Sequence, residues 1–200
     1  QAVIKEWIDD GAVWSIEMID PAVYASKPGA SDHWVQRLTV SEYIETVRSA
    51  VGVDIAKEAT RLLPPDLRAD GFSNTAYNLS VDLKHVEAYS QLAEMIVQRM
   101  DVLEFAKRFS KSQSLNTNAT ARKFVAAAGE RLLRGPLDDR EVTNYSGILT
   151  AVASAGGDYE QGVGLMVEAM LQSPRFIYRI ETQPDGGGNQ RVTDFELASR

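Results

Sequence analysis

A loop rich in acidic and amide residues is the first place where this sequence could do chemistry. The segment Asp70-Gly71-Phe72-Ser73-Asn74, preceded by Asp66 and Arg68, gathers hard oxygen donors in a turn. A calcium loop needs such oxygens at alternating positions together with a bidentate acid, and this spacing lacks the alternation. The sequence therefore predicts a hydrogen-bonded turn without a metal, or alternatively a partner-contact surface anchored by Phe72.

His85 follows this loop and could act as a proton-transfer group, because imidazole titrates near neutral pH. The simpler interpretation places it on a helix surface without a chemical role. A pocket lined by the loop acids and His85 would favour an enzyme, whereas polar atoms consumed in hydrogen bonds would not. The candidate pocket or partner surface consists of Asp66, Arg68, Asp70, Phe72, Asn74 and His85. No catalytic, cofactor-binding or metal-ligating residue is assigned.

Composition and motifs exclude several kinds of chemistry. The 200 residues include no Cys and only 2 His, which removes disulfides, thiolate catalysis, zinc–cysteine sites and covalent haem attachment within this chain. Ser-x-x-Lys, Gly-x-Ser-x-Gly and His-Glu-x-x-His are all missing from the sequence. Gly162-Val163-Gly164 follows no predicted strand and lacks the third glycine of a dinucleotide fingerprint, so close helix packing is the better interpretation.

A basic segment stands out in an otherwise acidic chain. The formal net charge is −7, which argues against nucleic-acid binding, yet residues 105–134 carry seven basic residues against Glu130 alone. This segment could dock an acidic redox or scaffold partner, or it could pair with acidic neighbours in the same protein. The basic patch comprises Lys107, Arg108, Lys111, Arg122, Lys123, Arg131 and Arg134.

The elements that must position these residues are predicted to be helices. Thr39-Val40-Ser41-Glu42 is a capping box, and a helix begins there and ends at Gly52. Further helices are expected at about 82–100, 102–109 and 120–133, after Asp138 and Asp158, and from Ser173 and Thr193. The inward face of 82–100 is predicted to comprise Leu83, Val86, Tyr89, Ala93, Ile96, Val97 and Met100. No stretch alternates convincingly with a period of two, so we predict an all-α fold of one or more multi-helix bundles with long structured loops. No stretch is long and apolar enough to span a membrane.

Several motifs resemble two helical domain families of unknown function that occur together in planctomycete proteins. Arg37-Leu38-Thr39-Val40-Ser41-Glu42-Tyr43, Leu63-Pro64-Pro65-Asp66 and Ala69-Asp70-Gly71-Phe72-Ser73-Asn74 resemble the first family. Arg134-Gly135-Pro136-Leu137 and Ser173-Pro174-Arg175-Phe176-Ile177-Tyr178-Arg179 resemble the second. Residues 4–12 are similar to the last helix of a cytochrome-c-like domain, and residues 197–200 to the start of a third family.

The resemblance implies an interior piece of an exported, multi-domain protein. The predicted organisation is a cytochrome-type tail at 1–15, a linker at 16–36, helical domains at 37–101 and 102–182, a glycine-rich linker at 183–192 and a truncated downstream domain at 193–200. It implies c-type haem upstream, none in this segment, and a periplasmic or secreted location. Neighbouring domains of the same protein are the expected partners. Whether the two helical domains share one core stays open.

Three functions follow from this organisation as hypotheses. The first is a non-catalytic helical module that holds a cytochrome domain against its neighbours and partners. The second is part of a haem-linked oxidoreductase active site, so the question of an enzyme stays open. The third is a carbohydrate-binding module that uses exposed aromatic residues such as Trp7, Trp14 and Trp34, although the preferred interpretation is that these residues staple neighbouring segments together.

Overall fold

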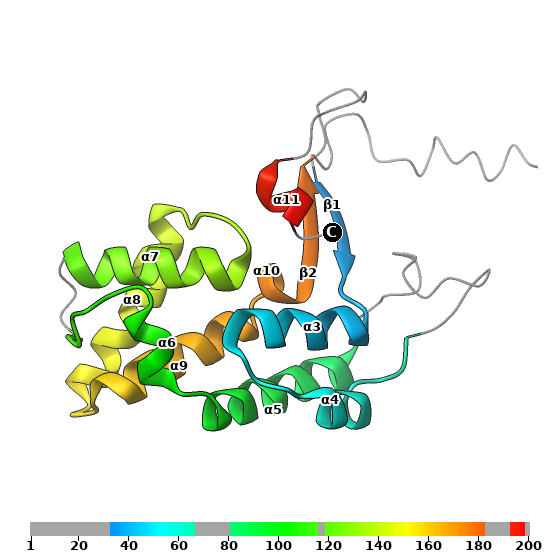
Figure 1. Cartoon of the computed structure of the whole chain (residues 1–200), viewed down its shortest axis with the longest axis horizontal. Helices are drawn as coiled ribbons and strands as arrows, with labels where there is room; N and C mark the ends of the chain where they lie inside the picture. The colour runs from blue at the N-terminus through cyan, green and yellow to red at the C-terminus, as the bar shows by residue number, and fades with distance from the viewer. Residues whose placement is uncertain (1–32, 67–80, 116–118, 183–192, 199–200) are drawn as a thin grey trace, which may run out of the picture. The chain divides into compact units, whose positions relative to one another are not determined.

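The fold is predominantly α-helical, as predicted. The computed structural model describes residues 33–66, 81–115, 119–182 and 193–198, and these contain helices α3 to α11 and one two-stranded sheet (Figure 1). The helices are α3 (Val40–Val51), α4 (Ala56–Leu62), α5 (Leu83–Arg99), α6 (Val102–Lys107), α7 (Ala119–Leu133), α8 (Asp139–Ser154), α9 (Tyr159–Leu171), α10 (Pro174–Ile177) and α11 (Asp194–Ala198). The strands are β1 (His33–Arg37) and β2 (Tyr178–Thr182). The predicted tail at 1–15 and linker at 183–192 lie outside the described residues.

Side-chain caps fix where the predicted helices begin. The Thr39 hydroxyl accepts from the Glu42 N–H at 3.3 Å, while Glu42 Oε2 accepts from the Thr39 N–H at 2.8 Å. Asp138 and Asp158 form the corresponding capping boxes of α8 and α9. At the other end of α3, Gly52 has a φ of 78°, the left-handed conformation that glycine tolerates best. The starts of these capped helices and the end of α3 at Gly52 are confirmed, because each depends on a local cap. Helix α6 instead ends at Lys107, before the expected residue 109.

Helix α4 and the two strands were not predicted. No side-chain cap marks the start of α4, where Ile55 stands at the N-cap position. The strands are five residues each and are far apart in sequence, so neither carries a long alternating pattern. The Leu38 N–H donates to the Ile177 carbonyl at 2.9 Å. This bond joins the residue after β1 to the residue before β2, so the strands run antiparallel.

One hydrophobic core serves both predicted helical domains. Buried apolar residues form one cluster that extends from Leu38 to Ile177. Helix α9 packs against α5, α7 and α8, which connects the N-terminal and C-terminal helices directly. The described residues between Val35 and Glu181 accordingly form one compact unit. The question left open by the sequence is answered: the two regions share a core.

The predicted inward face of α5 is wrong at its first turn. Leu83 is 71% exposed and Val86 55% exposed, whereas His85 and Leu92 are buried. The buried stripe runs through His85, Tyr89, Leu92 and Ile96 at steps of three and four. Leu83 lies two residues before the first of these, which places it on the opposite side of the helix.

Helix α9 approaches α5 closely at a glycine, in agreement with the packing interpretation of Gly162-Val163-Gly164. A Cβ at Gly164 would lie 3.1 Å from Val97 Cγ1, and one at Gly162 would lie 2.6 Å from Leu115 Cδ2. These positions have little room for a side chain.

Among the described residues, no helix combines the length and apolarity that a membrane crossing requires.

Candidate functional site

The paired strands bring the two groups of family-like motifs together. Strand β1 leads into α3, which carries the first motif, and β2 follows α10, which carries the last one. Polar side chains from Glu42, Arg134, Arg175 and Arg179 therefore meet at this place. We call these four residues, together with Glu141, the charged junction.

Glu42 connects the first motif to the last. Its Oε2 accepts from the Thr39 N–H and hydroxyl, both at 2.8 Å, and its Oε1 accepts from Arg179 Nη2 at 2.9 Å. Burial by itself raises the pKa of Glu42, but the hydrogen bonds from Thr39 and the charge of Arg179 together outweigh it and leave the pKa lowered. The carboxylate thus performs two tasks, capping α3 and pairing with β2.

Arg134 ties the end of α7 to the end of α10. Its Nη2 donates to the carbonyls of Arg175 at 2.9 Å, Phe176 at 3.0 Å and Tyr178 at 2.7 Å. The guanidinium carbon also lies 5.9 Å from the centre of the Phe176 ring. Burial, with the positive charge of Arg179 as a second cause, lowers the pKa of Arg134 to about 10. The group is still protonated at neutral pH, so it satisfies carbonyls that the short helix leaves open.

Arg175 fixes the start of α8 to the same place. Its Nη1 donates to both Glu141 carboxylate oxygens, at 2.8 and 2.6 Å, and its Nη2 donates to the Pro136 carbonyl at 3.2 Å. Ser173 accepts from the Arg175 N–H at 3.3 Å, which confirms its predicted role as the cap of α10. The arginines of the charged junction are therefore occupied by contacts within the fold.

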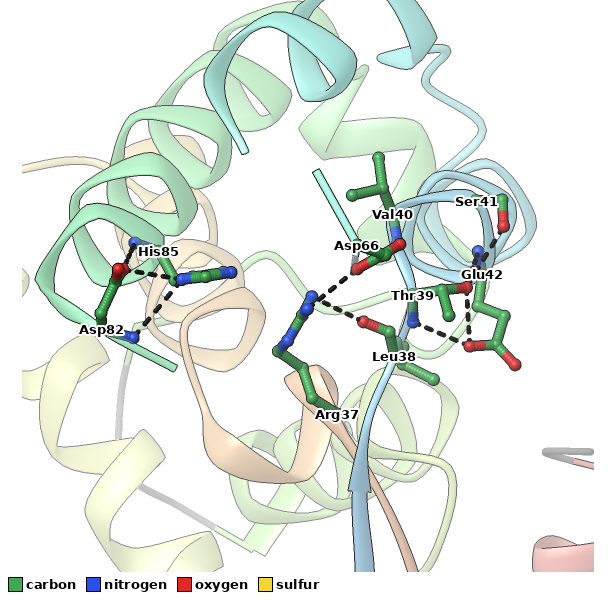
Figure 2. Close-up of polar contacts among 9 residues, drawn as sticks. All are labelled: Arg37, Leu38, Thr39, Val40, Ser41, Glu42, Asp66, Asp82 and His85. Carbon is green, nitrogen blue, oxygen red and sulfur yellow. Dashed lines mark hydrogen bonds and ion pairs between the residues drawn. The ribbon is translucent and has the colours of Figure 1, made fainter. Parts of the chain in front are cut away.

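A buried ion pair holds Asp66, the first of the predicted pocket residues. Asp66 Oδ1 accepts from Arg37 Nη2 at 2.9 Å and Oδ2 accepts from the Val40 N–H at 2.7 Å (Figure 2). Arg37 also donates to the Leu38 carbonyl at 3.0 Å, and its side chain is only 2% exposed. Both oxygens of Asp66 are thus used to anchor the end of β1 and the start of α3.

His85 forms a second polar group, at the start of α5. Its Nδ1 lies 2.7 Å from Asp82 Oδ1, and its backbone N–H donates to the same oxygen at 3.1 Å (Figure 2). The hydrogen bond from His85 lowers the pKa of Asp82. His85 is 7% exposed, so its expected place on a helix surface is wrong. The side chain lies on the buried stripe of α5 and also serves as the third-position partner in a capping box.

The described members of the predicted pocket do not converge on a catalytic arrangement. Asp66 pairs with Arg37 and His85 pairs with Asp82, and within the described ranges no hydrogen bond joins the two pairs. Four members, Arg68, Asp70, Phe72 and Asn74, lie outside the described residues. In the part of the chain that the structure describes, no group of three His, Cys, Asp or Glu residues is placed to hold a metal.

An aromatic cluster underlies the two polar groups. The rings of Tyr43 and Tyr89 are 5.0 Å apart between centroids, and Phe176 stands edge-on to Tyr43 at 5.9 Å. Burial raises the pKa of both tyrosines, with the neighbouring Tyr89 adding to the shift of Tyr43. Helices α3, α5 and α10 thereby contact one another through aromatic packing.

The basic patch divides between separate roles. Lys107 pairs with Glu104 at 2.6 Å, and Arg122 donates to the Thr143 hydroxyl at 3.0 Å. Arg131 donates to the Ser49 carbonyl and Arg134 belongs to the charged junction. Arg108, Lys111 and Lys123 are exposed. The clustering in sequence therefore combines structural and surface residues.

Sequence reasoning missed the long-range partners of the charged junction. Glu42 was recognised as a cap, but its bond to Arg179 spans 137 positions. Arg134 was assigned to the basic patch, although it lies next to a glycine and a proline that mark a helix end. The available signal was the occurrence of these residues inside the quoted motifs, and it did not indicate which residues pair.

Two regions of the chain match sequence models of protein families. Residues 36–102 match the sequence model of PSD3, a protein of unknown function (DUF1587), and residues 120–181 match that of PSD5, a protein of unknown function (DUF1595). Comparison with curated proteins and with solved structures gave no match. Two regions similar to PSD3 and PSD5 therefore follow each other along the chain, and charged residues of the two regions pair with each other inside one folded unit.

Proposed function

We propose that this part of the chain is a non-catalytic helical scaffold whose two family regions act as one rigid unit. The observation that carries the proposal is the pairing of motif side chains with each other: Glu42 with Arg179, and Arg134 with the carbonyls of α10 and β2. Polar residues that serve catalysis direct hydrogen-bond donors or acceptors at the substrate. The described motif residues instead use their donors and acceptors in contacts within the fold.

The scaffold is proposed to hold neighbouring domains of an exported protein linked to c-type cytochromes. The resemblance of residues 4–12 to a cytochrome-c tail and the tandem order of the two families support this setting. Electron transfer would then belong to a haem domain elsewhere in the protein. The partners would be these neighbouring domains and an acidic redox or scaffold protein, reached through the exposed members of the basic patch.

The first measurement is the sequence of the reading frame upstream of Gln1. A Cys-x-x-Cys-His run within about 100 residues would support the cytochrome setting, since that run attaches c-type haem. A frame that starts near Gln1 would overturn the setting. The role of the scaffold itself is then tested by cross-linking mass spectrometry on the full-length protein.

The cross-linking experiment compares two substitutions. Arg134→Ala breaks the charged junction, and we expect it to change the cross-links between the flanking domains. His85→Gln serves as the matched control, because glutamine at the third helix position keeps the capping box. Unchanged cross-links in Arg134→Ala would contradict the scaffold role.

A second function, part of a haem-linked oxidoreductase site, has one specific observation in its favour. The 2.7 Å contact between Asp82 and His85 Nδ1 orients the imidazole as a carboxylate orients a general base. Under the scaffold proposal, substrate-dependent haem reduction in the full-length protein survives His85→Gln. Its loss in a variant with an unchanged urea midpoint would favour the oxidoreductase.

A further inference from the structure

A groove of about 710 Å³ lies between the end of α5, the end of α8 and the exposed side of α9. It is separate from the charged junction. Its apolar lining includes Val97 from α5, Val152 from α8 and Leu165 from α9. Leu165 is 49% exposed, which is unusual for a leucine in the middle of a helix whose other apolar residues are almost all buried.

The close approach of two helices forms the floor of this groove. Gly164 lines it, and a Cβ at this position would lie 3.1 Å from Val97 Cγ1. Val97 fills the space beside Gly164, so the floor of the groove is apolar and closely packed at this point. An apolar side chain from outside could pack on this floor and contact both helices.

Negative charge borders the groove. Glu160 and Glu168 line it, and the described residues that line it include no Lys or Arg. Glu94 lies close enough that its charge, added to the effect of burial, raises the pKa of Glu168. None of these three carboxylates forms an ion pair with another described residue. An arriving cation would relieve their mutual repulsion.

We propose that this groove docks a basic amphipathic helix of a partner protein. Apolar side chains at helical spacing would contact Leu165 and Val97, and Lys or Arg residues beside them would pair with Glu160 and Glu168. The proposal deepens the proposed scaffold function, because it rests on that role and names a partner. An apolar floor with an uncompensated acidic border is complementary to such a helix and repels an acidic one.

Fluorescence anisotropy with a labelled Leu/Lys amphipathic peptide of about 15 residues, long enough to form a helix on docking, tests the proposal. A scrambled Leu/Lys peptide of the same charge and a Leu/Glu peptide serve as controls. We expect saturable binding of the amphipathic Leu/Lys peptide to the full chain and weak binding of both controls. Equal binding of the scrambled peptide would overturn the proposal, since attraction by charge alone would then explain it.

Two matched pairs of variants locate the binding. We expect Leu165→Ala and Glu168→Gln each to weaken binding by about three- to tenfold, in the range of a single partly desolvated contact. Leu83→Ala and Glu87→Gln make the same changes on the exposed side of the first half of α5 and should leave binding unchanged. Leu165→Ala is compared with Leu83→Ala, and Glu168→Gln with Glu87→Gln. Equal effects on binding in both comparisons would overturn the proposed location.

Sedimentation velocity over a dilution series distinguishes a second copy of this chain as the occupant. We expect the same sedimentation coefficient at all concentrations. Self-association that Leu165→Ala abolishes would assign the groove to a second copy and overturn the proposed partner. Failure of peptide binding would leave the cross-linking test of the scaffold unaffected, so the two proposals can fail separately.

Discussion

Arg134 combines a conformation that favours glycine with a side chain that no glycine could replace. Its φ is 58°, in the left-handed region, where a residue with a Cβ is strained by roughly 1 kcal/mol. Yet its Nη2 group shares its two hydrogens among three carbonyls of α10 and β2. A hydrogen bond from a charged donor contributes about 1.5–3 kcal/mol, which outweighs the backbone strain.

Two substitutions at this position separate the backbone effect from the side-chain effect. We expect Arg134→Ala to lower the free energy of unfolding by about 2–4 kcal/mol, because the carbonyls lose their hydrogen-bond donor while the backbone strain at this position remains. Arg134→Gly should cost about 1 kcal/mol less, since glycine adopts this φ freely. Urea unfolding monitored by circular dichroism measures both, and a glycine variant more stable than the native protein would show that the hydrogen bonds contribute nothing.

At the scale of the helix, capping residues set the boundaries and carry a measurable share of stability. Asp138 accepts from the Glu141 N–H at 2.7 Å, while the neighbouring Asp139 is exposed and lies 3.6 Å from Arg122. The two aspartates are adjacent and have the same charge. They therefore form a natural pair for measuring a cap against a surface charge.

We expect Asp138→Ala to lower the free energy of unfolding by about 1 kcal/mol, because the Glu141 N–H loses its acceptor. Asp139→Ala should change it by only a few tenths of a kcal/mol, as is usual for an exposed ion pair. Thermal and urea unfolding of both variants provide the comparison. Equal losses would mean that charge at the helix start, and not the hydrogen bond, stabilises α8.

The same local signals explain which elements the sequence predicted. The capping boxes at Thr39, Asp138 and Asp158 each depend on four consecutive residues, so the sequence alone predicts these helices. The structure confirms all three. Helix α4 starts at Ala56, and its N-cap residue Ile55 forms no side-chain cap; the pairing of β1 with β2 depends on residues far apart in the chain. Such pairing has no local pattern that a single sequence can reveal.

At the scale of the molecule, the predicted site residues were only partly informative. The capping role of Glu42 could be read from its neighbours, but its bond to Arg179 could not, because 137 positions separate them. His85 and Asp66 were selected for their chemistry, and each has a partner that the sequence did not indicate. A shared core for the PSD3 and PSD5 regions likewise required the three-dimensional structure.

The Glu42–Arg179 pair links stability to pH across the two family regions. Hydrogen bonds from Thr39, together with the charge of Arg179, lower the pKa of Glu42 in the folded protein, so these contacts contribute stability above the ordinary glutamate pKa of about 4.3. This contribution is lost as the pH falls from that value through the lowered folded pKa. We expect Glu42→Gln to unfold at a lower urea concentration than the native protein at neutral pH, with the difference shrinking toward acidic pH.

Urea midpoints measured between neutral pH and about pH 3, where a normal glutamate is mostly protonated, test this dependence. Glu45→Gln is the control on the same helix, since Glu45 forms an ion pair with the exposed Arg48 of its own helix. A pH-independent difference between native protein and Glu42→Gln would contradict the linkage.

The antiparallel pairing of β1 with β2 also has a mechanical consequence. The chain enters the compact unit along β1 and leaves it along β2, at the same end of a two-stranded sheet, before residues 193–198 join the same unit again. A force that pulls these two points apart would load the ladder of hydrogen bonds one rung at a time, as in opening a zipper. The strands would separate before tension reached the helices. Under force, this strand pair would therefore open first while the core stays folded.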